Sequence, residues 1–217
     1  MLKRAILAIA LAVGAAGGGQ AATVVNGSFE TGPNPNGGLG FITLGTGDSS
    51  ITGWTVTGGS IDYIGDYWTA QDGSRSIDLA GTSLGKLTQT ITDTIVGQRY
   101  AVNFWVSKNP DGGAATRTGT FKAGDQTFNF SYATPNDRTN MNWQLETFEF
   151  FATSTTTDLS FAADASAGCC FGPALDNVSI DAVPEPATWA MMIGGFGLVG
   201  GALRAARRRS ARALATA

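Results

Sequence analysis

Histidine is absent from this chain of 217 residues. Its absence excludes Ser-His-Asp and Cys-His catalysis, and it also excludes metal sites built on imidazole ligands. Proline is sparse, and outside the two ends of the chain no uncharged or amphipathic run has helical spacing. Glycine, threonine and serine are abundant instead. The composition therefore favours strands over helices for most of the chain.

Basic residues are also scarce once the two ends are set aside. All 17 Asp and Glu residues lie within residues 22–186, with only 7 of the 14 Lys and Arg residues, so this part carries a net charge of −10. Binding of nucleic acid needs a basic face, and nucleic acid is therefore not an expected partner. An acidic body without histidine is suited to solubility or to cation binding.

The amino end reads as a secretory signal peptide covering residues 1–21. Lys3 and Arg4 form its positive start, an apolar region follows over residues 5–13, and Gly-Gln-Ala at residues 19–21 is a small-residue cleavage site. The sequence therefore predicts export, with residues 22–182 forming a single folded domain beyond the inner membrane.

The carboxyl end predicts a membrane anchor. Residues 187–203 include no charge over 17 positions, close to the roughly 20 residues of a transmembrane helix. The arginines behind this run resist translocation and predict a cytoplasmic tail, residues 210–217. Ahead of it, two prolines flank Glu185 and keep the backbone extended, in a form that a protease could recognise.

The same end resembles the PEP-CTERM sorting signal, in its PEPxxWA variety, over residues 183–209. The resemblance implies transient anchoring in the inner membrane of a Gram-negative bacterium, and recognition of the Pro-Glu-Pro segment by an exosortase. An ordinary single-pass anchor that is never processed is the alternative. The residues that carry the motif are Pro184, Glu185, Pro186, Trp189, Ala190, Arg207, Arg208 and Arg209.

Alternating apolar residues predict many short strands between the two ends. Tyr100, Val102, Phe104 and Val106 share one face of a strand, and a turn at residues 123–126 predicts a hairpin. About ten or eleven such strands indicate an antiparallel sandwich or barrel. The other segments are Phe41–Leu44, Trp54–Thr57, Ser60–Ile64, Ser76–Leu79, Lys86–Thr92, Phe128–Tyr132, Gln144–Ala152, Thr157–Ala162 and Ala174–Ile180.

A second resemblance covers most of the body. Residues 26–30 (Asn-Gly-Ser-Phe-Glu), Gly53-Trp54, residues 72–79 and residues 172–178 (Gly-Pro-Ala-Leu-Asp-Asn-Val) are similar to the choice-of-anchor C and DUF642 families, which are related to galactose-binding-like modules. The resemblance implies an all-β, antiparallel jelly-roll sandwich. It implies the fold more firmly than the ligand.

The resemblance also implies a structural calcium ion. In such modules the first and last strands lie side by side, and acidic residues on them hold Ca²⁺ together with backbone carbonyls. The matching residues here are Glu30, after the first strand, and Asp176, in the last. The alternative is that Glu30 is exposed and that Asp176 caps a turn through local hydrogen bonds.

Aromatic and acidic residues cluster in one stretch, as a sugar site requires. Tyr67 and Trp68 lie in an expected loop next to Asp66, and a pyranose ring could stack there. The alternative is that the rings belong to the core or its rim, and Trp54 in particular alternates as a core residue does.

The two cysteines, Cys169 and Cys170, are adjacent. In an oxidising periplasm they could form a strained vicinal disulfide, and an intermolecular cross-link or a free thiol pair are the alternatives. The resembled domains carry a cysteine close before Gly-Pro, which implies a structural role.

The hypothesis drawn from the sequence is an exported, non-catalytic surface or matrix protein that binds exopolysaccharide. A glycan-cleaving enzyme that uses paired carboxylates is the alternative, and so is a purely structural passenger. The candidate carboxylates are Asp62, Asp66, Asp72, Asp78, Glu146 and Glu149.

Overall fold

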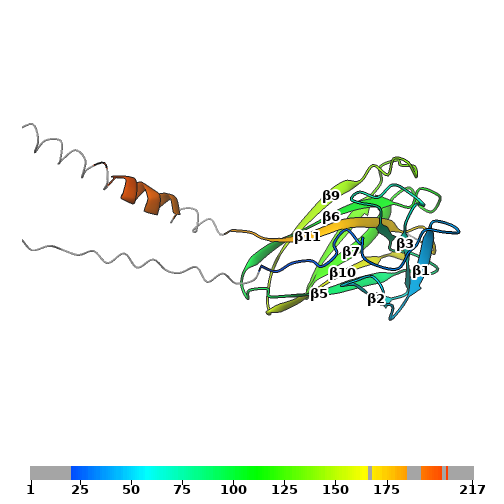
Figure 1. Cartoon of the computed structure of the whole chain (residues 1–217), viewed down its shortest axis with the longest axis horizontal. Helices are drawn as coiled ribbons and strands as arrows, with labels where there is room; N and C mark the ends of the chain where they lie inside the picture. The colour runs from blue at the N-terminus through cyan, green and yellow to red at the C-terminus, as the bar shows by residue number, and fades with distance from the viewer. Residues whose placement is uncertain (1–20, 166–167, 185–191, 202–203, 205–217) are drawn as a thin grey trace, which may run out of the picture.

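The computed structural model describes residues 21–165, 168–184, 192–201 and 204. Figure 1 shows two antiparallel sheets packed face to face in this part of the chain, so the predicted all-β sandwich is confirmed. The strands are β1 (Phe41–Gly45), β2 (Thr55–Gly58), β3 (Ser60–Ile64), β4 (Ser76–Asp78), β5 (Lys86–Thr92), β6 (Arg99–Lys108), β7 (Arg117–Ala123), β8 (Gln126–Tyr132), β9 (Gln144–Phe151), β10 (Thr156–Ala163) and β11 (Pro173–Ala182).

The sheets follow the orders β1-β3-β4-β11-β6-β9 and β2-β5-β10-β7-β8. The predicted hairpin is present, with β7 and β8 joined at residues 123–126. The predicted strands differ from the observed ones mainly at their ends, and β7 is the element that the sequence pattern showed least clearly.

The core lies between the sheets and is rich in aromatic rings. The predicted face of β6 points inward, and Phe104 on this face is fully buried, with ring centroids of Phe121 and Phe161 at 5.5 and 4.9 Å. Trp54 is also buried, as predicted, and its indole N–H donates to the Asn26 carbonyl. Each such side chain contributes about 1.5–3 kcal/mol to folding by leaving water.

The two long central strands define the two ends of the sandwich. In the antiparallel register, Pro173 of β11 lies opposite Lys108 of β6, and Ala182 lies opposite Tyr100. We call the end with Lys108 and Pro173 the pocket end, and the end where β11 stops the exit end. With about 3.3 Å per residue, the two ends lie about 30 Å apart.

The targeting segments fall largely outside the described residues. The signal peptide predicted for residues 1–21 lies outside them except for Ala21, and of the eight residues named above as carrying the sorting motif only Pro184 is described. Residues 192–201, within the predicted transmembrane helix 187–203, are helical. No helix in the described part of the chain has the length and apolar character needed to cross a bilayer.

Candidate functional site

Two neighbouring pockets open at the pocket end of the sandwich. The smaller has a volume of about 280 Å³ and is lined by Phe41, Asp62, Tyr67, Asn109 and Phe171, among others. The larger, of about 400 Å³, is lined by residues that include Asn36, Asp66, Ser74, Arg75 and Arg138. Tyr67 and Trp68 border both pockets, so two of the predicted ligand contacts lie at the wall between them, and Asp66 lies in the larger pocket.

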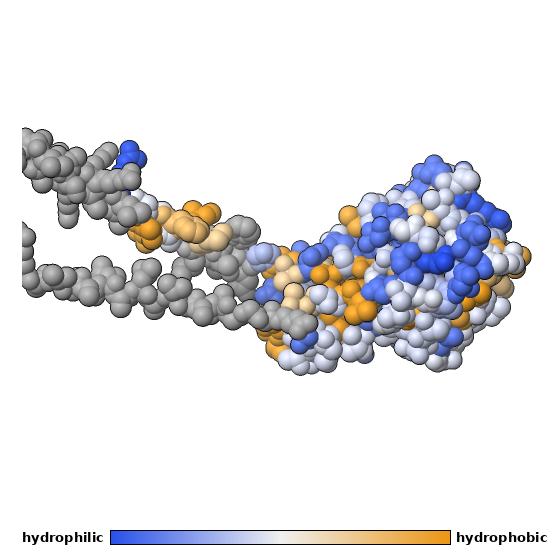
Figure 2. Space-filling view, in the orientation of Figure 1, coloured by the Kyte–Doolittle hydropathy of each residue, from blue (hydrophilic) through white to orange (hydrophobic). Residues whose placement is uncertain are grey.

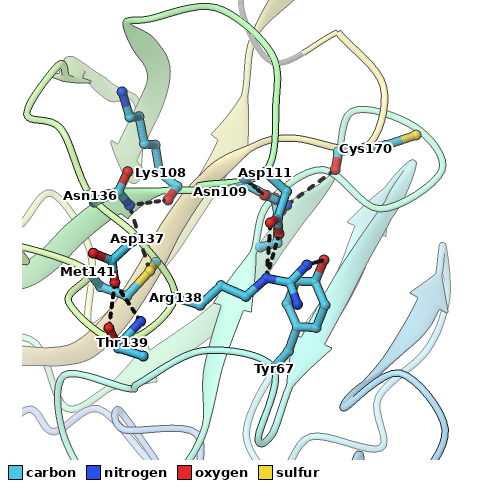
Figure 3. Close-up of polar contacts among 11 residues, drawn as sticks. Tyr67, Lys108, Asn109, Asp111, Asn136, Asp137, Arg138, Thr139, Met141 and Cys170 are labelled. Atoms are coloured by element: carbon cyan, nitrogen blue, oxygen red, sulfur yellow. Dashed lines mark hydrogen bonds and ion pairs between the residues drawn. The ribbon is translucent and has the colours of Figure 1, made fainter.

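Tyr67 is held by a cluster of polar contacts. The Arg138 guanidinium lies over its ring, 3.9 Å from the centroid, and Arg138 Nη2 donates to the Tyr67 hydroxyl at 2.6 Å. Arg138 Nε donates to both carboxylate oxygens of Asp111, at 2.9 and 3.1 Å. Figure 3 shows these three side chains converging from separate loops. The ring and the guanidinium therefore fix each other's orientation.

The loop that carries Arg138 is itself pinned. Asn136 donates through Nδ2 to the Lys108 carbonyl at 2.7 Å. Asp137 accepts hydrogen bonds from Thr139 and Asn140, and the bond from the Thr139 side chain is the main reason that the pKa of Asp137 is lowered. Local capping of this kind presents Arg138 in one position before any ligand arrives.

Trp68 forms the floor beneath Tyr67 and is not a surface platform. Its side chain is buried, packs in a small cluster with Ile64, Met141 and Ala174, and donates through Nε1 to Ser76 Oγ at 2.8 Å. Tyr67 is partly exposed. Of the two predicted aromatic contacts, Tyr67 is therefore the one that a ligand can reach over a substantial area.

Two buried carboxylates lie behind the smaller pocket. Asp62 of β3 and Asp78 of β4 are direct partners across the sheet. Burial is the main cause that raises the pKa of both, and it raises the pKa of Asp78 to about 7. Asp78 accepts hydrogen bonds from the N–H groups of Ala80 and Gly172 and from Asn109 Nδ2, all at 2.9 Å. Only Asp62 of the pair reaches the pocket lining.

The other predicted carboxylate pair does not come together. Glu146 and Glu149 are three residues apart on β9, so their side chains leave opposite faces of the strand. Glu149 forms an ion pair with Arg99 at 3.1 Å. Asp72 lies in an exposed loop.

Glu30 and Asp176, the predicted calcium ligands, both hold the loop at residues 71–75. Asp176 is buried and accepts hydrogen bonds from the N–H groups of Gln71 and Asp72, at 2.7 and 3.1 Å. Glu30 accepts hydrogen bonds from the N–H groups of Ser74 and Arg75, at 2.8 and 2.7 Å. These hydrogen bonds already satisfy part of the acceptor capacity of both carboxylates.

The expected strand before Glu30 is not present, which corrects that part of the prediction. Positive φ angles at Asn26 (54°) and Phe29 (61°) break the extended backbone. The segment still lies beside β11, because the Val178 N–H donates to the Gly27 carbonyl at 2.9 Å. In the described part of the chain, no group of three or more His, Cys, Asp or Glu residues could hold a metal ion. Calcium at this pair stays a prediction.

Cys169 and Cys170 are free thiols in the structure. The Cys170 backbone has a φ of 82°, and its carbonyl accepts a hydrogen bond from Asn109 at 3.4 Å. A hydrogen bond with Cys169 is the main cause that raises the pKa of the Cys170 thiol, to about 11. Figure 3 shows the Cys170 sulfur directed away from Tyr67 and Arg138.

Sequence reasoning missed Arg138, Asp111 and Asn109 as members of the site. Arg138 is 71 residues from Tyr67 along the chain, and the contact depends on two loops that the sandwich brings to one end. One available signal was compositional. Arg138 is one of only seven basic residues in the acidic body, and it stands in the polar stretch Asn136-Asp137-Arg138-Thr139-Asn140.

Comparison with protein families gives two matches. The model DUF642, described as a protein of unknown function, matches residues 22–181. The model of the PEP-CTERM protein-sorting motif matches residues 182–209. Halomucin of Haloquadratum walsbyi is 34% identical over 179 residues, which are 80% of this chain but 2% of that protein. The chain thus spans a very small share of this relative.

Solved structures with a similar fold include carbohydrate-binding modules. TmCBM61 in complex with beta-1,4-galactotriose is 15% identical, with a TM-score of 0.43 over 73% of this chain and 96% of that chain. A CBM4 structure is 18% identical, with a TM-score of 0.41 over 74% and 99%. Arabinose-bound MgGH51 α-L-arabinofuranosidase is 12% identical, with a TM-score of 0.49 over 77% of this chain and 27% of that chain.

Proposed function

The chain belongs to the DUF642 family and ends in a PEP-CTERM sorting motif, and from this we propose that it is an exported, non-catalytic surface protein whose sandwich binds a glycan at the pocket end. The observation that carries the proposal is the cluster of Tyr67, Arg138 and Asp111 between two open pockets. Recognition of a sugar needs an aromatic face with fixed hydrogen-bonding groups beside it.

The geometry of the cluster suggests how a sugar binds. Arg138 lines only the larger pocket and covers one face of the Tyr67 ring. Tyr67 also lines the smaller pocket, so a pyranose would contact the part of the ring that Arg138 leaves open there, where Thr43, Asp62 and Asn109 supply polar groups. The apolar rings of Phe41 and Phe171 close that pocket and would exclude water from the sugar's less polar face.

The larger pocket holds two arginines, of which Arg138 is paired with Asp111 and Arg75 is not in an ion pair in the described part of the chain, and Arg75 would suit an acidic sugar unit. Arg75 and Arg138 line it together, although the body as a whole has only 7 basic residues against 17 acidic ones. Asp66 is the one acidic side chain in the lining. Arginine suits planar carboxylates because its donors match two oxygens at once. A polysaccharide with carboxylated sugars at intervals would use both pockets.

The position of the sorting motif determines how the pocket end is oriented relative to the membrane. In this proposal residues 187–203 enter the inner membrane, an exosortase recognises Pro184-Glu185-Pro186, and the body faces the periplasm or, after release, the extracellular matrix. The pockets lie at the pocket end, about 30 Å from the point where β11 stops. The binding face is therefore presented away from the anchor.

Affinity measurements on a polysaccharide panel test the proposal. The panel contains acidic and neutral exopolysaccharides, and retention is measured with the unmodified protein, Tyr67→Ala and Arg138→Lys. Tyr67→Ala is expected to weaken binding about tenfold, the value of one lost stacking contact. Arg138→Lys keeps the charge but loses the paired bonds to Asp111, and it should weaken acidic glycans more than neutral ones.

Lys122→Ala is the matched control, because it removes an exposed charge on β7, on the other sheet. Retention of no polysaccharide by the unmodified protein, with or without calcium, would refute glycan binding at the pocket end and favour a structural passenger. If Lys122→Ala weakened polysaccharide binding as much as Tyr67→Ala, the binding site would not be at the pocket end.

A glycan-cleaving enzyme is the second candidate, favoured by the raised pKa values of Asp62 and Asp78. Acid catalysis often uses a carboxyl group with a raised pKa. Against it, Asp78 has no exposed surface and its oxygens already accept three hydrogen bonds. Release of reducing ends from polysaccharide, lost in Asp62→Asn or Asp66→Asn but not in Glu149→Gln, would support this candidate.

A further inference from the structure

At the exit end, one turn has exposed apolar residues at positions that are usually polar in turns. Ile95, Val96, Gly97 and Gln98 form a tight turn, closed by the Gln98 N–H donating to the Ile95 carbonyl at 2.9 Å, with Gly97 at a φ of 83°. Ile95 and Val96 are 60% and 61% exposed. Turns normally hold Gly, Pro, Asn, Asp or Ser, so two adjacent exposed aliphatic residues here call for an occupant.

A third apolar side chain lies beside this turn. Phe151, at the end of β9, pairs in register with Arg99 and is 57% exposed. The next residue, Ala152, accepts a hydrogen bond from the Gly97 N–H at 2.8 Å, which fixes the turn against the end of β9. We call Ile95, Val96 and Phe151 together the apolar tip. Figure 2 shows that apolar surface is more extensive on the half of the body nearer this end.

The chain leaves the sandwich directly beside the apolar tip. The Val183 N–H donates to the Arg99 carbonyl at 2.8 Å, and Gln98 Nε2 donates to the Val183 carbonyl at 2.8 Å. The uncharged stretch begins four residues later, at Ala187. Four extended residues span at most about 14 Å. If residues 187–203 enter a bilayer, the tip must lie within about that distance of its surface.

We propose that the apolar tip inserts into the headgroup region of the bilayer that holds the carboxyl end of the same chain. This inference rests on the anchoring in the proposed function. The occupant is a lipid surface, because a short tether keeps the tip close to one and the tip has exposed aliphatic and aromatic side chains of the kind that bury at such an interface. Asp93 and Asp125 lie beside the tip, and the nearby Arg99 is balanced by its ion pair with Glu149, so zwitterionic lipid is favoured over anionic lipid.

Site-specific fluorescence in nanodiscs tests the insertion. The full chain, with Cys169→Ser and Cys170→Ser, receives one new cysteine at Val96, Leu145 or Phe196, and each is labelled with an environment-sensitive fluorophore. The protein is reconstituted in phosphatidylcholine nanodiscs that contain lipid spin-labelled near the headgroup or along the acyl chain. Leu145 is the matched control, because it is exposed to a similar degree on β9 but six residues, about 20 Å, from Phe151.

Headgroup-region quenching at position 96, with none at 145, is the expected result. Replacing Ile95 and Phe151 with serine should lower the ratio of docked to undocked molecules about tenfold for each side chain removed. Replacing part of the phosphatidylcholine with phosphatidylglycerol should lower quenching at 96.

Three results would overturn the inference in different ways. Quenching at 196 without any at 96 would show an anchored body whose tip does not touch lipid. A blue-shifted label at 96 that no spin-labelled lipid quenches would mean that protein, such as a second copy, covers the tip. Absence of acyl-chain quenching at 196 would refute the anchoring itself, and with it both the inference and that part of the proposed function.

Discussion

Replacement of Asp78 by asparagine should remove a pH dependence of stability that the unmodified protein shows. Burial raises the pKa of Asp78 from 3.8 to about 7. Between these two values the folded protein holds a proton that the unfolded chain has released. The stability from this group is therefore fully present below pH 4 and is lost as pH rises through about 7.

The expected magnitude follows from the two pKa values. One pKa unit corresponds to 1.36 kcal/mol, and the unfolding free energy should fall by about 2–3 kcal/mol between pH 5 and pH 8 through this one group. Urea unfolding of residues 22–184 at the two pH values is the assay. With an m-value of about 2 kcal/mol per molar, Asp78 alone should lower the midpoint by about 1 M.

The Asp78→Asn variant separates this effect from every other carboxylate. Its side chain keeps one acceptor oxygen and turns an NH2 group toward at least one of the three donors that Asp78 binds, so the variant has a fixed cost at both pH values. The diagnostic quantity is the change in midpoint between pH 5 and pH 8, which should shrink by about 1 M in the variant. An equal change in both proteins would refute the assignment of the raised pKa to Asp78. Asp176, whose pKa burial also raises to about 7, should behave in the same way when replaced by asparagine.

Three further predictions follow from the loops. If Glu30 and Asp176 hold calcium, an excess of about ten times the dissociation constant should add about 1.4 kcal/mol of stability over EDTA; an unchanged melting temperature would leave both carboxylates as loop clamps. Alkylation of Cys170 at pH 8 should be much slower than that of exposed Cys169, and should rise about tenfold per pH unit up to its pKa of about 11, as peptide mass mapping would show. Gly97→Ala should cost about 1–2 kcal/mol of unfolding free energy because its φ is 83° in open space, whereas Gly45→Ala, with the same open space and no positive φ, should cost little; equal costs would contradict the turn geometry.

Much of the sandwich could be predicted because its strands record their environment in alternating residues. The face of Tyr100, Val102, Phe104 and Val106 is buried as the pattern requires, and Trp54 is a core residue. Alternation reports which side of a strand meets the core, and it does so locally. The strand expected before Glu30 was predicted wrongly, because single residues with positive φ interrupt that segment and the pattern of apolar residues does not reveal them.

The candidate site could be predicted only in part, for a physical reason. The stretch with Tyr67 and Trp68 was identifiable because aromatic and acidic residues are adjacent there in the sequence. Arg138 and Asp111 join Tyr67 through contacts between loops that are far apart along the chain. Trp68 is the buried ring of the two because it packs with Ile64, Met141 and Ala174 and donates to Ser76, and these contacts with residues distant in the sequence are not encoded in any local pattern.

Strand β11 runs the whole distance from the pockets to the point where the chain leaves the body, between β4 and β6. Under the proposed function, a pull between a bound glycan and the membrane anchor would act largely along this strand. Its ladder bonds lie across the direction of the load, so many of them would have to fail together before the sandwich yields. A sandwich with this strand direction would therefore resist unfolding when flow pulls on it.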